Sequence, residues 1–144
     1  MPNLFARFMG PLDARFLGND MWLVLNDLTY QRDIKEFITV PRGFITDYAS
    51  TPRFVWLFMP KSGEYDPAAV VHDFIYVMGG VLPGKTYTKA DADHIFLETM
   101  EVLGVGWVKR KLMHQAVKWF GKGSFELIRS GIISPPTFPS SPTK

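Results

Sequence analysis

The sequence predicts an α+β domain, in which a small antiparallel sheet at about residues 21–46 precedes a helical half of three to five helices. Residues 21–46 are rich in β-branched and aromatic residues, and turn residues interrupt them at short intervals. After residue 46, helix start and stop signals follow one another along the chain. The chain has 144 residues, of which 47% are apolar, and this is enough for one domain with its own core.

The two ends of the chain differ in composition from the middle. Residues 1–20 are rich in Gly, Pro and aromatic residues and show neither a helical nor a strand period, which predicts an N-terminal arm. Residues 21–133 form the single α+β domain. Residues 134–144 contain four prolines among Ser and Thr, which predicts an extended C-terminal tail. Arm and tail are both suited to contacts with a neighbouring subunit.

Three or four short antiparallel strands are expected between residues 21 and 46. Turn residues separate the strand formers at Asn26-Asp27, at Arg32-Asp33 and at residues 41–43. The sequence therefore predicts a meander of short strands joined by tight turns.

Helical signals begin at Thr51-Pro52, where a short helix opens that Pro60 closes. Asp66-Pro67 opens a second helix, and the following glycines end it. Thr88 and Asp91 have the spacing of a capping box at the start of a third helix. The five expected helices cover residues 52–59, 67–78, 89–103, 106–120 and 125–130.

Composition excludes several classes of protein. There is no cysteine, so disulfides, thiolate metal sites and cysteine nucleophiles are excluded, and a metal would need oxygen and imidazole ligands. The net charge of +2 argues against a nucleic-acid binder. No apolar run approaches the roughly 20 residues of a transmembrane segment. Without a signal-peptide pattern, synthesis in the cytoplasm without export is expected, and carriage in a particle would be compatible with this.

Three polar residues interrupt a helix that is otherwise apolar on almost all sides. His72, Asp73 and Tyr76 lie within about 100° of one another on a helix of 100° per residue. Ala69 lies between them and leaves room in front of the stripe. Because a helix that is apolar all round is buried, these polar groups are expected to face inward.

The next helix contains a second inward-facing acid. Asp93 lies on the same side as Leu97 and Met100, whereas Asp91, His94, Glu98 and Glu101 fall on the side expected to face solvent. An unpaired buried carboxylate costs several kcal/mol, so Asp93 must have a partner.

One imidazole with several carboxylates suits Zn²⁺, Mn²⁺ or Mg²⁺, and a divalent metal would activate a bound water. We expect His72, Asp73 and Asp93 to hold such a metal. Catalytic roles would fall to Asp47 as a further ligand or base, and to Tyr76 or Ser50 as donors to an oxyanion. Arg53 would bind an anionic substrate group. Without a metal, His72 oriented by one acid would serve as a general base.

The last long helix carries four basic residues between Trp107 and Trp119. Contact with phosphate or a membrane surface is one interpretation, and amphipathic packing with extended lysines is the other. Its predicted core residues are Leu112, Met113, Ala116, Val117 and Phe120.

Four stretches together resemble a family of short phage and prophage proteins catalogued as a domain of unknown function. They are TDYASTPR at residues 46–53, AVVHDFIY at 69–76, ADHIF at 92–96 and AVKWFG at 116–121. The resemblance covers about residues 20–121. It implies a phage origin and recurrent polar positions at the candidate site residues, and it implies no established activity.

Two functions remain open at this point. The first is a metal-dependent hydrolase acting on a polar bacterial substrate, such as cell-wall peptide or glycan. The second is a non-enzymatic virion component, of a tail or capsid, that uses arm and tail for contacts with phage structural proteins or with itself. In the second, the His/Asp cluster is a buried hydrogen-bond network that fixes the sheet against the helices.

Overall fold

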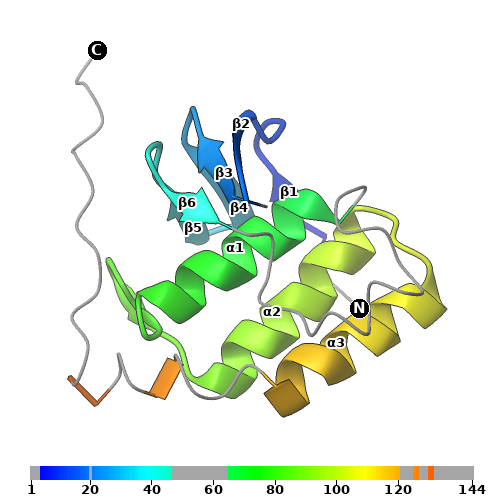
Figure 1. Ribbon diagram of the computed structural model, residues 1–144. Coiled ribbons are helices and arrows are strands. Elements are labelled where there is room, and N and C mark those ends of the chain that lie inside the picture. The colour runs from blue at the N-terminus through cyan, green and yellow to red at the C-terminus, as the bar shows by residue number, and fades with distance from the viewer. Residues whose placement is uncertain (1–3, 20, 47–64, 121–124, 127–129, 132–144) are drawn as a thin grey trace.

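A computed structural model of the chain describes residues 4–19, 21–46, 65–120, 125–126 and 130–131. It confirms the α+β class, with strands first and three long helices after them (Figure 1). The strands are β1 (Arg7–Phe8), β2 (Ala14–Gly18), β3 (Met21–Val24), β4 (Leu28–Asp33), β5 (Glu36–Val40), β6 (Ile45–Thr46), β7 (Val81–Leu82) and β8 (Lys85–Thr86). The helices are α1 (Asp66–Val77), α2 (Lys89–Val102) and α3 (Trp107–Phe120).

The strands form two three-stranded antiparallel sheets and a separate hairpin. The strand orders are β1-β4-β5 and β2-β3-β6, and β7 pairs with β8. Of the three or four strands predicted between residues 21 and 46, four are present, and they are divided between two sheets. The turn expected at Arg32-Asp33 lies at residues 34–35, because Asp33 still pairs with Glu36. The β7–β8 hairpin was not predicted.

The first twenty residues differ from the expected arm. Strand β1 pairs with β4, with Phe8 opposite Tyr30, and strand β2 pairs with β3, with Ala14 opposite Val24. The Phe8 and Tyr30 rings pack with their centroids 5.0 Å apart. Such short strands carry little periodicity of their own, and partners elsewhere in the chain stabilise them.

The helix boundaries agree closely with the sequence signals. Gly79 and Gly80 follow α1 with positive φ, as expected for a glycine stop. The capping box of α2 is confirmed, because Thr88 Oγ1 accepts from the Asp91 amide at 3.0 Å and Asp91 Oδ2 accepts from the Thr88 amide at 2.9 Å. At α1 the N-cap is Tyr65, and Asp66 lies inside the first turn rather than capping it.

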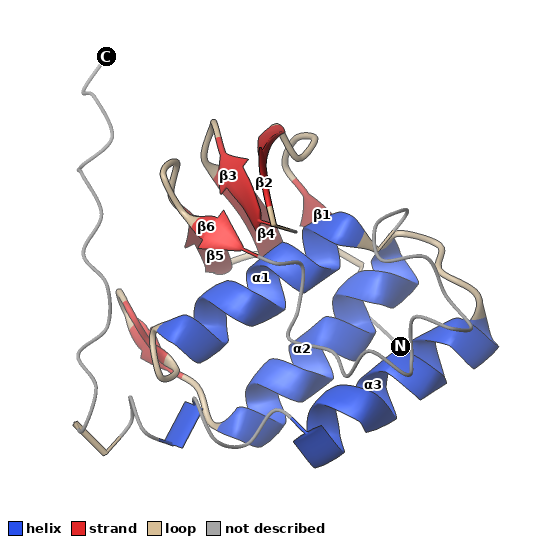
Figure 2. Cartoon of the chain, in the orientation of Figure 1, coloured by secondary structure: helices blue, strands red, loops and turns tan. Residues whose placement is uncertain are grey.

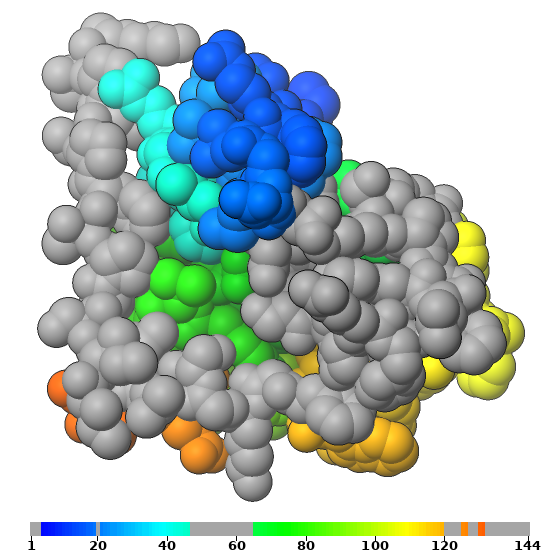
Figure 3. All heavy atoms as spheres, in the orientation of Figure 1, coloured from blue at the N-terminus to red at the C-terminus, as the bar shows by residue number. Residues whose placement is uncertain are grey.

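The strands, α1, α2 and α3 form successive layers in the order in which they occur along the chain. Helix α1 packs against β5 and β6 on one side and against α2 on the other, and α3 packs on α2 (Figure 2). In the space-filling view, the blue and cyan residues, which include strands β1 to β6, lie together at one end, above the green residues of α1 (Figure 3). The largest fully buried side chains include Tyr30, Phe44, Tyr87 and Phe96, which lie between these layers.

Helix α3 corrects one core assignment. Met113, Ala116 and Val117 are buried as predicted, but Leu112 is 42% exposed because it lies on the outer side of the helix. The side chain of Phe120, the helix expected over residues 52–59 and the tail at 134–144 lie outside the described part of the structure, as does most of the segment 125–130. None of the described helices is both long and apolar enough to cross a membrane.

Candidate functional site

The carboxylate of Asp93 is the centre of a buried polar cluster between α1 and α2. His72 Nε2 lies 2.9 Å from Asp93 Oδ1, and the Tyr76 hydroxyl donates to the same oxygen at 2.5 Å. Both His72 and Asp93 are only 3% exposed. The prediction that Asp93 faces inward and has a partner is therefore confirmed, and two of its partners are the predicted residues of α1.

The helical repeat explains why these side chains meet. His72 and Tyr76 are four residues apart, so they lie on the same face of α1, one turn from each other. Their rings pack with centroids 4.2 Å apart, and the His72 ring is 4.8 Å from that of Phe96 on α2. The imidazole is thus held by aromatic packing on its sides and by a hydrogen bond at one edge.

Lys89 is a member of the cluster that sequence analysis missed. Its Nζ donates to Asp93 Oδ2 at 2.6 Å and to the main-chain carbonyls of Val117 and Lys118, at 3.3 and 3.1 Å. These three acceptors match the three N–H groups of an ammonium. The four-residue spacing from Lys89 to Asp93 is a signal that could have identified this pair from the sequence.

The protonation states in the cluster follow from its hydrogen bonds. Burial alone would raise the pKa of Asp93, but hydrogen bonds from His72, Lys89 and Tyr76 outweigh it and lower that pKa. Burial lowers the pKa of His72 despite the opposing effect of Asp93. Burial, together with the hydrogen bond to Asp93, raises the pKa of Tyr76. At neutral pH the cluster holds a carboxylate, a neutral imidazole, a phenol and an ammonium.

These states determine the histidine tautomer. An ionised carboxylate can only accept, so the proton of the neutral imidazole is on Nε2, which faces Asp93. The other nitrogen, Nδ1, is buried and has no hydrogen-bond partner among the described residues. A buried polar atom without a partner costs about 1–3 kcal/mol. Its lone pair is the group in the cluster that could accept a proton or bind a cation.

The structure separates the predicted site residues into three groups. It brings His72, Tyr76 and Asp93 together. Asp73 is half-buried beside His72, and the described hydrogen bonds of Asp93 do not include it. The remaining three, Asp47, Ser50 and Arg53, lie outside the described residues.

The observed partners bear on the expected metal and on Tyr76. Across residues 4–19, 21–46, 65–120 and the four described later positions, no three His, Asp or Glu side chains form a metal-binding group. Both oxygens of Asp93 accept hydrogen bonds, and one faces an ammonium, which favours an orienting role over direct coordination. A metal at His72, Asp73 and Asp93 stays a prediction. The Tyr76 proton is used on Asp93, so in this arrangement Tyr76 supports the carboxylate rather than an oxyanion.

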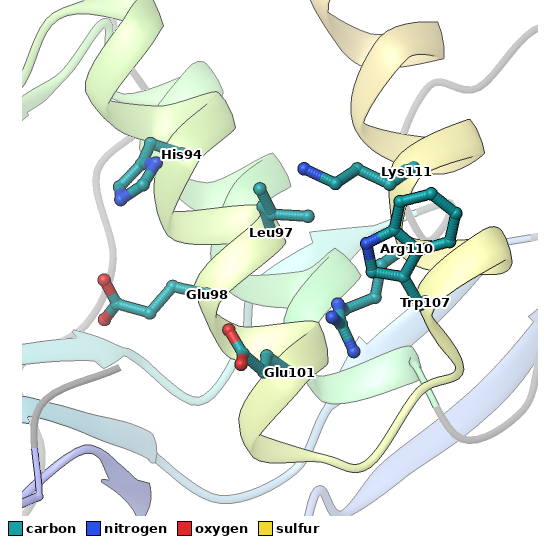
Figure 4. A pocket seen from close by; sticks show the side chains of 7 residues that line it. All are labelled: His94, Leu97, Glu98, Glu101, Trp107, Arg110 and Lys111. Carbon is teal, nitrogen blue, oxygen red and sulfur yellow. The ribbon is translucent and has the colours of Figure 1, made fainter. Parts of the chain in front are cut away.

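Cavities line the groove between α2 and α3. One, of about 660 Å³, borders Asp93 and Lys89 and is also lined by Ala90, Asp91, His94, His114, Lys118 and Glu126. A second, of about 190 Å³, continues from His94 past Glu101 to Trp107 and Arg110 (Figure 4). Asp93 is therefore next to a solvent-facing hollow, whereas His72 is not among the residues that line it.

Glu98 was predicted to face solvent, and this prediction is wrong. Its carboxylate accepts from the Tyr30 hydroxyl at 2.6 Å and from Arg32 Nε at 3.4 Å, both on strand β4. The helical repeat placed Glu98 beside Asp91 and His94, which are exposed as expected. Strand β4 packs on the part of this helix face that carries Glu98. The residue pattern of one helix does not show which part of an otherwise exposed face a sheet will cover.

The fold and this cluster define a small α+β protein with a buried histidine–carboxylate pair between two helices. The chain belongs to the family described as "Protein of unknown function (DUF1353)", whose model matches residues 22–117. The matched range includes α1, α2 and most of α3, and hence the cluster. Neither the curated proteins nor the solved structures contain a significant match. The resemblance to a family of unknown function is confirmed, and the phage origin stays a prediction.

Proposed function

We propose that the protein is a small hydrolase of a polar bacterial substrate, with cell-wall peptide or glycan as the first candidate, and that His72 is its general base. One observation supports this most strongly. Asp93 accepts from Nε2 of His72 and leaves a buried Nδ1 with no described partner. A histidine whose tautomer is set by a carboxylate and whose second nitrogen is free is the arrangement that general-base catalysis requires.

For a peptide substrate, the steps follow from this arrangement. Nδ1 takes a proton from water as the water oxygen attacks the carbonyl carbon, and Asp93 stabilises the imidazolium that forms. When the tetrahedral intermediate collapses, Nδ1–H gives that proton to the leaving amine. Tyr76 and Lys89 act by keeping Asp93 ionised and in place. Ser50 as an oxyanion donor, Arg53 as an anion-binding group and Asp47 as an additional base complete the proposal.

The test uses purified bacterial sacculi and mass spectrometry of the released fragments. Asp93→Asn and His72→Gln should each lower release by a factor on the order of 10²–10⁴, the usual contribution of a positioned base. Lys35→Gln is the control, because Lys35 is exposed on the β4–β5 turn and lines neither cavity of the α2–α3 groove. Circular dichroism checks that each variant is folded. No release by the unmodified protein, or equal release by His72→Gln, would contradict the proposal.

A metal-dependent form of the same hydrolase is the second version of this proposal. The free Nδ1 of His72 is a suitable imidazole donor, and Asp73 with Asp47 would supply the carboxylate oxygens. A bound divalent metal would lower the pKa of its water, and Asp93 would orient the imidazole from behind. Metal analysis of purified protein tests it: stoichiometric Zn²⁺, Mn²⁺ or Mg²⁺ should be lost in His72→Gln. If the protein retains no metal after incubation with Zn²⁺, Mn²⁺ or Mg²⁺, the metal-dependent version is contradicted and the metal-free version is not.

The burial of the cluster favours a second candidate, a non-enzymatic virion or assembly component. At 3% exposure, His72 and Asp93 are as inaccessible as core residues, which a structural network would also explain. In that case His72→Ala should cost about 1–3 kcal/mol of unfolding free energy. Deleting residues 134–144 should abolish incorporation into phage particles and leave the domain folded. Unchanged incorporation would speak against this role.

A further inference from the structure

Helix α3 carries a stripe of exposed apolar side chains on its outer side. Val108 is 70% exposed, Leu112 42% and Trp119 69%. At about 100° per residue, these three side chains fall within about 40° of one another around the helix. Met113 and Val117 lie further round the helix, about 100° and 140° from Leu112, and pack into the core. Ala116, about 40° from Leu112, is buried as well. The apolar residues of α3 therefore form one broad arc, of which the edge at Val108, Leu112 and Trp119 is exposed.

The same helix carries only positive charge. Its four charged residues are Lys109, Arg110, Lys111 and Lys118, and it contains no Asp or Glu. Lys111 and Lys118 flank the outer stripe on one side and Lys109 flanks it on the other, by the same helical repeat. The acids of α2, Glu98 and Glu101, line the α2–α3 groove with Arg110 and Lys111 (Figure 4), and that groove does not include the outer stripe.

We propose that this outer face of α3 binds an anionic lipid surface. The stripe of Val108, Leu112 and Trp119 would enter the boundary between head groups and acyl chains, and the flanking lysines would reach lipid phosphates. Tryptophan is favoured at this depth because its ring is apolar and its N–H is polar. The proposal is independent of the hydrolase activity, because the residues of the apolar stripe do not belong to the His72 cluster, which Lys118 contacts through its main-chain carbonyl.

The composition of the face favours lipid over the other anionic or apolar partners. A nucleic acid offers phosphates and stacking surfaces, but it offers little to the exposed aliphatic groups of Val108 and Leu112. A second copy of α3 would bring its three flanking lysines against the same three, which disfavours a symmetric contact between these faces. An anionic bilayer provides both the negative charge and the apolar layer.

Flotation of the full chain with lipid vesicles tests the proposal. The protein should float with phosphatidylcholine vesicles that contain phosphatidylglycerol, much less with pure phosphatidylcholine, and less as salt is added. Each cation near an anionic surface should contribute on the order of a fivefold change in partitioning. Lys109→Glu and Lys111→Glu should therefore lower partitioning more than Lys35→Glu, which replaces an exposed lysine on the β4–β5 turn.

A second set of variants tests the apolar stripe. Leu112→Ser combined with Trp119→Ser should lower partitioning at least tenfold. Ile34→Ser combined with Phe37→Ser is the matched control, because these residues are similarly exposed, at 59% and 48%, and lie in the β4–β5 hairpin. Absence of flotation, equal binding to neutral vesicles, or equal effects of the two double variants would overturn the proposal. Sedimentation velocity would overturn it as well if the protein self-associates, the Leu112→Ser and Trp119→Ser double variant abolishes this self-association, and vesicle binding of the variant is unchanged.

Discussion

The chemistry of His72 depends on which of its two ring nitrogens carries the proton. The hydrogen bond from Nε2 to Asp93 places the proton there, and packing against Tyr76 and Phe96 keeps the ring from rotating away. A histidine free in solution exchanges between tautomers, whereas this one is limited to one of them. The consequence is a basic nitrogen, Nδ1, at a defined position in a site of low polarity.

We expect nitrogen NMR to detect this tautomer directly. At neutral pH, the Nε2 shift of His72 should be that of a protonated nitrogen and the Nδ1 shift that of an unprotonated one. In Asp93→Asn this preference should weaken or reverse, because an amide can donate as well as accept. The signals are assigned by their loss in His72→Gln. A protonated Nδ1 in the unmodified protein would show that the proton assignment is wrong.

Stability should depend on pH through the same residue. The pKa of His72 is lowered by burial, so the unfolded chain binds its proton more readily than the folded one. The free energy of unfolding should therefore fall as pH drops below the ordinary histidine value of 6.5. The contribution of Asp93, whose pKa is also lowered, should be lost below its ordinary value of 3.8.

Urea denaturation at a series of pH values measures this effect. Between pH 6.5 and pH 3.8, the free energy of unfolding should decline less steeply with falling pH in His72→Gln than in the unmodified chain. His114→Gln is measured beside it, because burial also lowers the pKa of His114. The comparison separates the contribution of His72 to the pH dependence from that of His114. If the slope were unchanged in His72→Gln, the buried imidazole would not be the source of the dependence.

Helix α2 is the element that connects the other parts of the site. Its first turn carries Lys89, whose ammonium joins Asp93 on the same helix to the last carbonyls of α3. A cation at a helix C-terminus also interacts favourably with the helix dipole. The position of the Asp93 carboxylate and the end of α3 are therefore coupled through one side chain.

Replacing Lys89 should affect both the Asp93 carboxylate and the last turn of α3. Lys89→Met should lower the free energy of unfolding by about 1–3 kcal/mol, because a carboxylate and two carbonyls lose their donor. Amide hydrogen exchange should accelerate in the last turn of α3. Lys111→Met, on the exposed side of α3, is the control for the loss of a positive charge. Equal effects of the two substitutions would show that the three hydrogen bonds of Lys89 contribute little.

Two half-buried acids connect parts of the fold in addition to the apolar core. Glu98 of α2 accepts from Tyr30 and Arg32 of β4. Glu36 of β5 accepts from Arg32, Lys85 and Tyr87, and so connects the β7–β8 hairpin to the same sheet. Through these contacts, strand and helix halves are expected to unfold together in one transition.

Glu98→Ala tests this connection. It leaves the hydroxyl of Tyr30, a fully buried residue, without its acceptor and should cost about 1–3 kcal/mol. Glu101→Ala, one turn later and without a described partner on the sheet, should cost much less. Urea denaturation of the two variants is followed by circular dichroism, which reports on the helices, and by tryptophan fluorescence. Separate midpoints for the two signals in the unmodified protein would contradict a single transition.

Much of this architecture could be predicted from local patterns. The apolar stretch of α1, the capping box at Thr88 and the inward position of Asp93 all follow from a 3.6-residue repeat. Strands β1 and β2 were missed because their pairing depends on β4 and β3, which lie further along the chain. Leu112 was placed in the core because it adjoins the buried Ala116 on one broad apolar arc of α3, and the repeat does not show where along that arc burial ends.

The spacing of residues along each helix established that His72, Tyr76 and Asp93 turn inward, because burial of a face depends on the repeat within one element. Which of them meet, and through which atoms, depended on how α1, α2 and α3 pack. That packing brought Lys89 to the end of α3 and Glu98 to the sheet, and left Nδ1 of His72 without a described partner. Contacts between elements are set by distances in space, and the order of residues in one segment does not contain them.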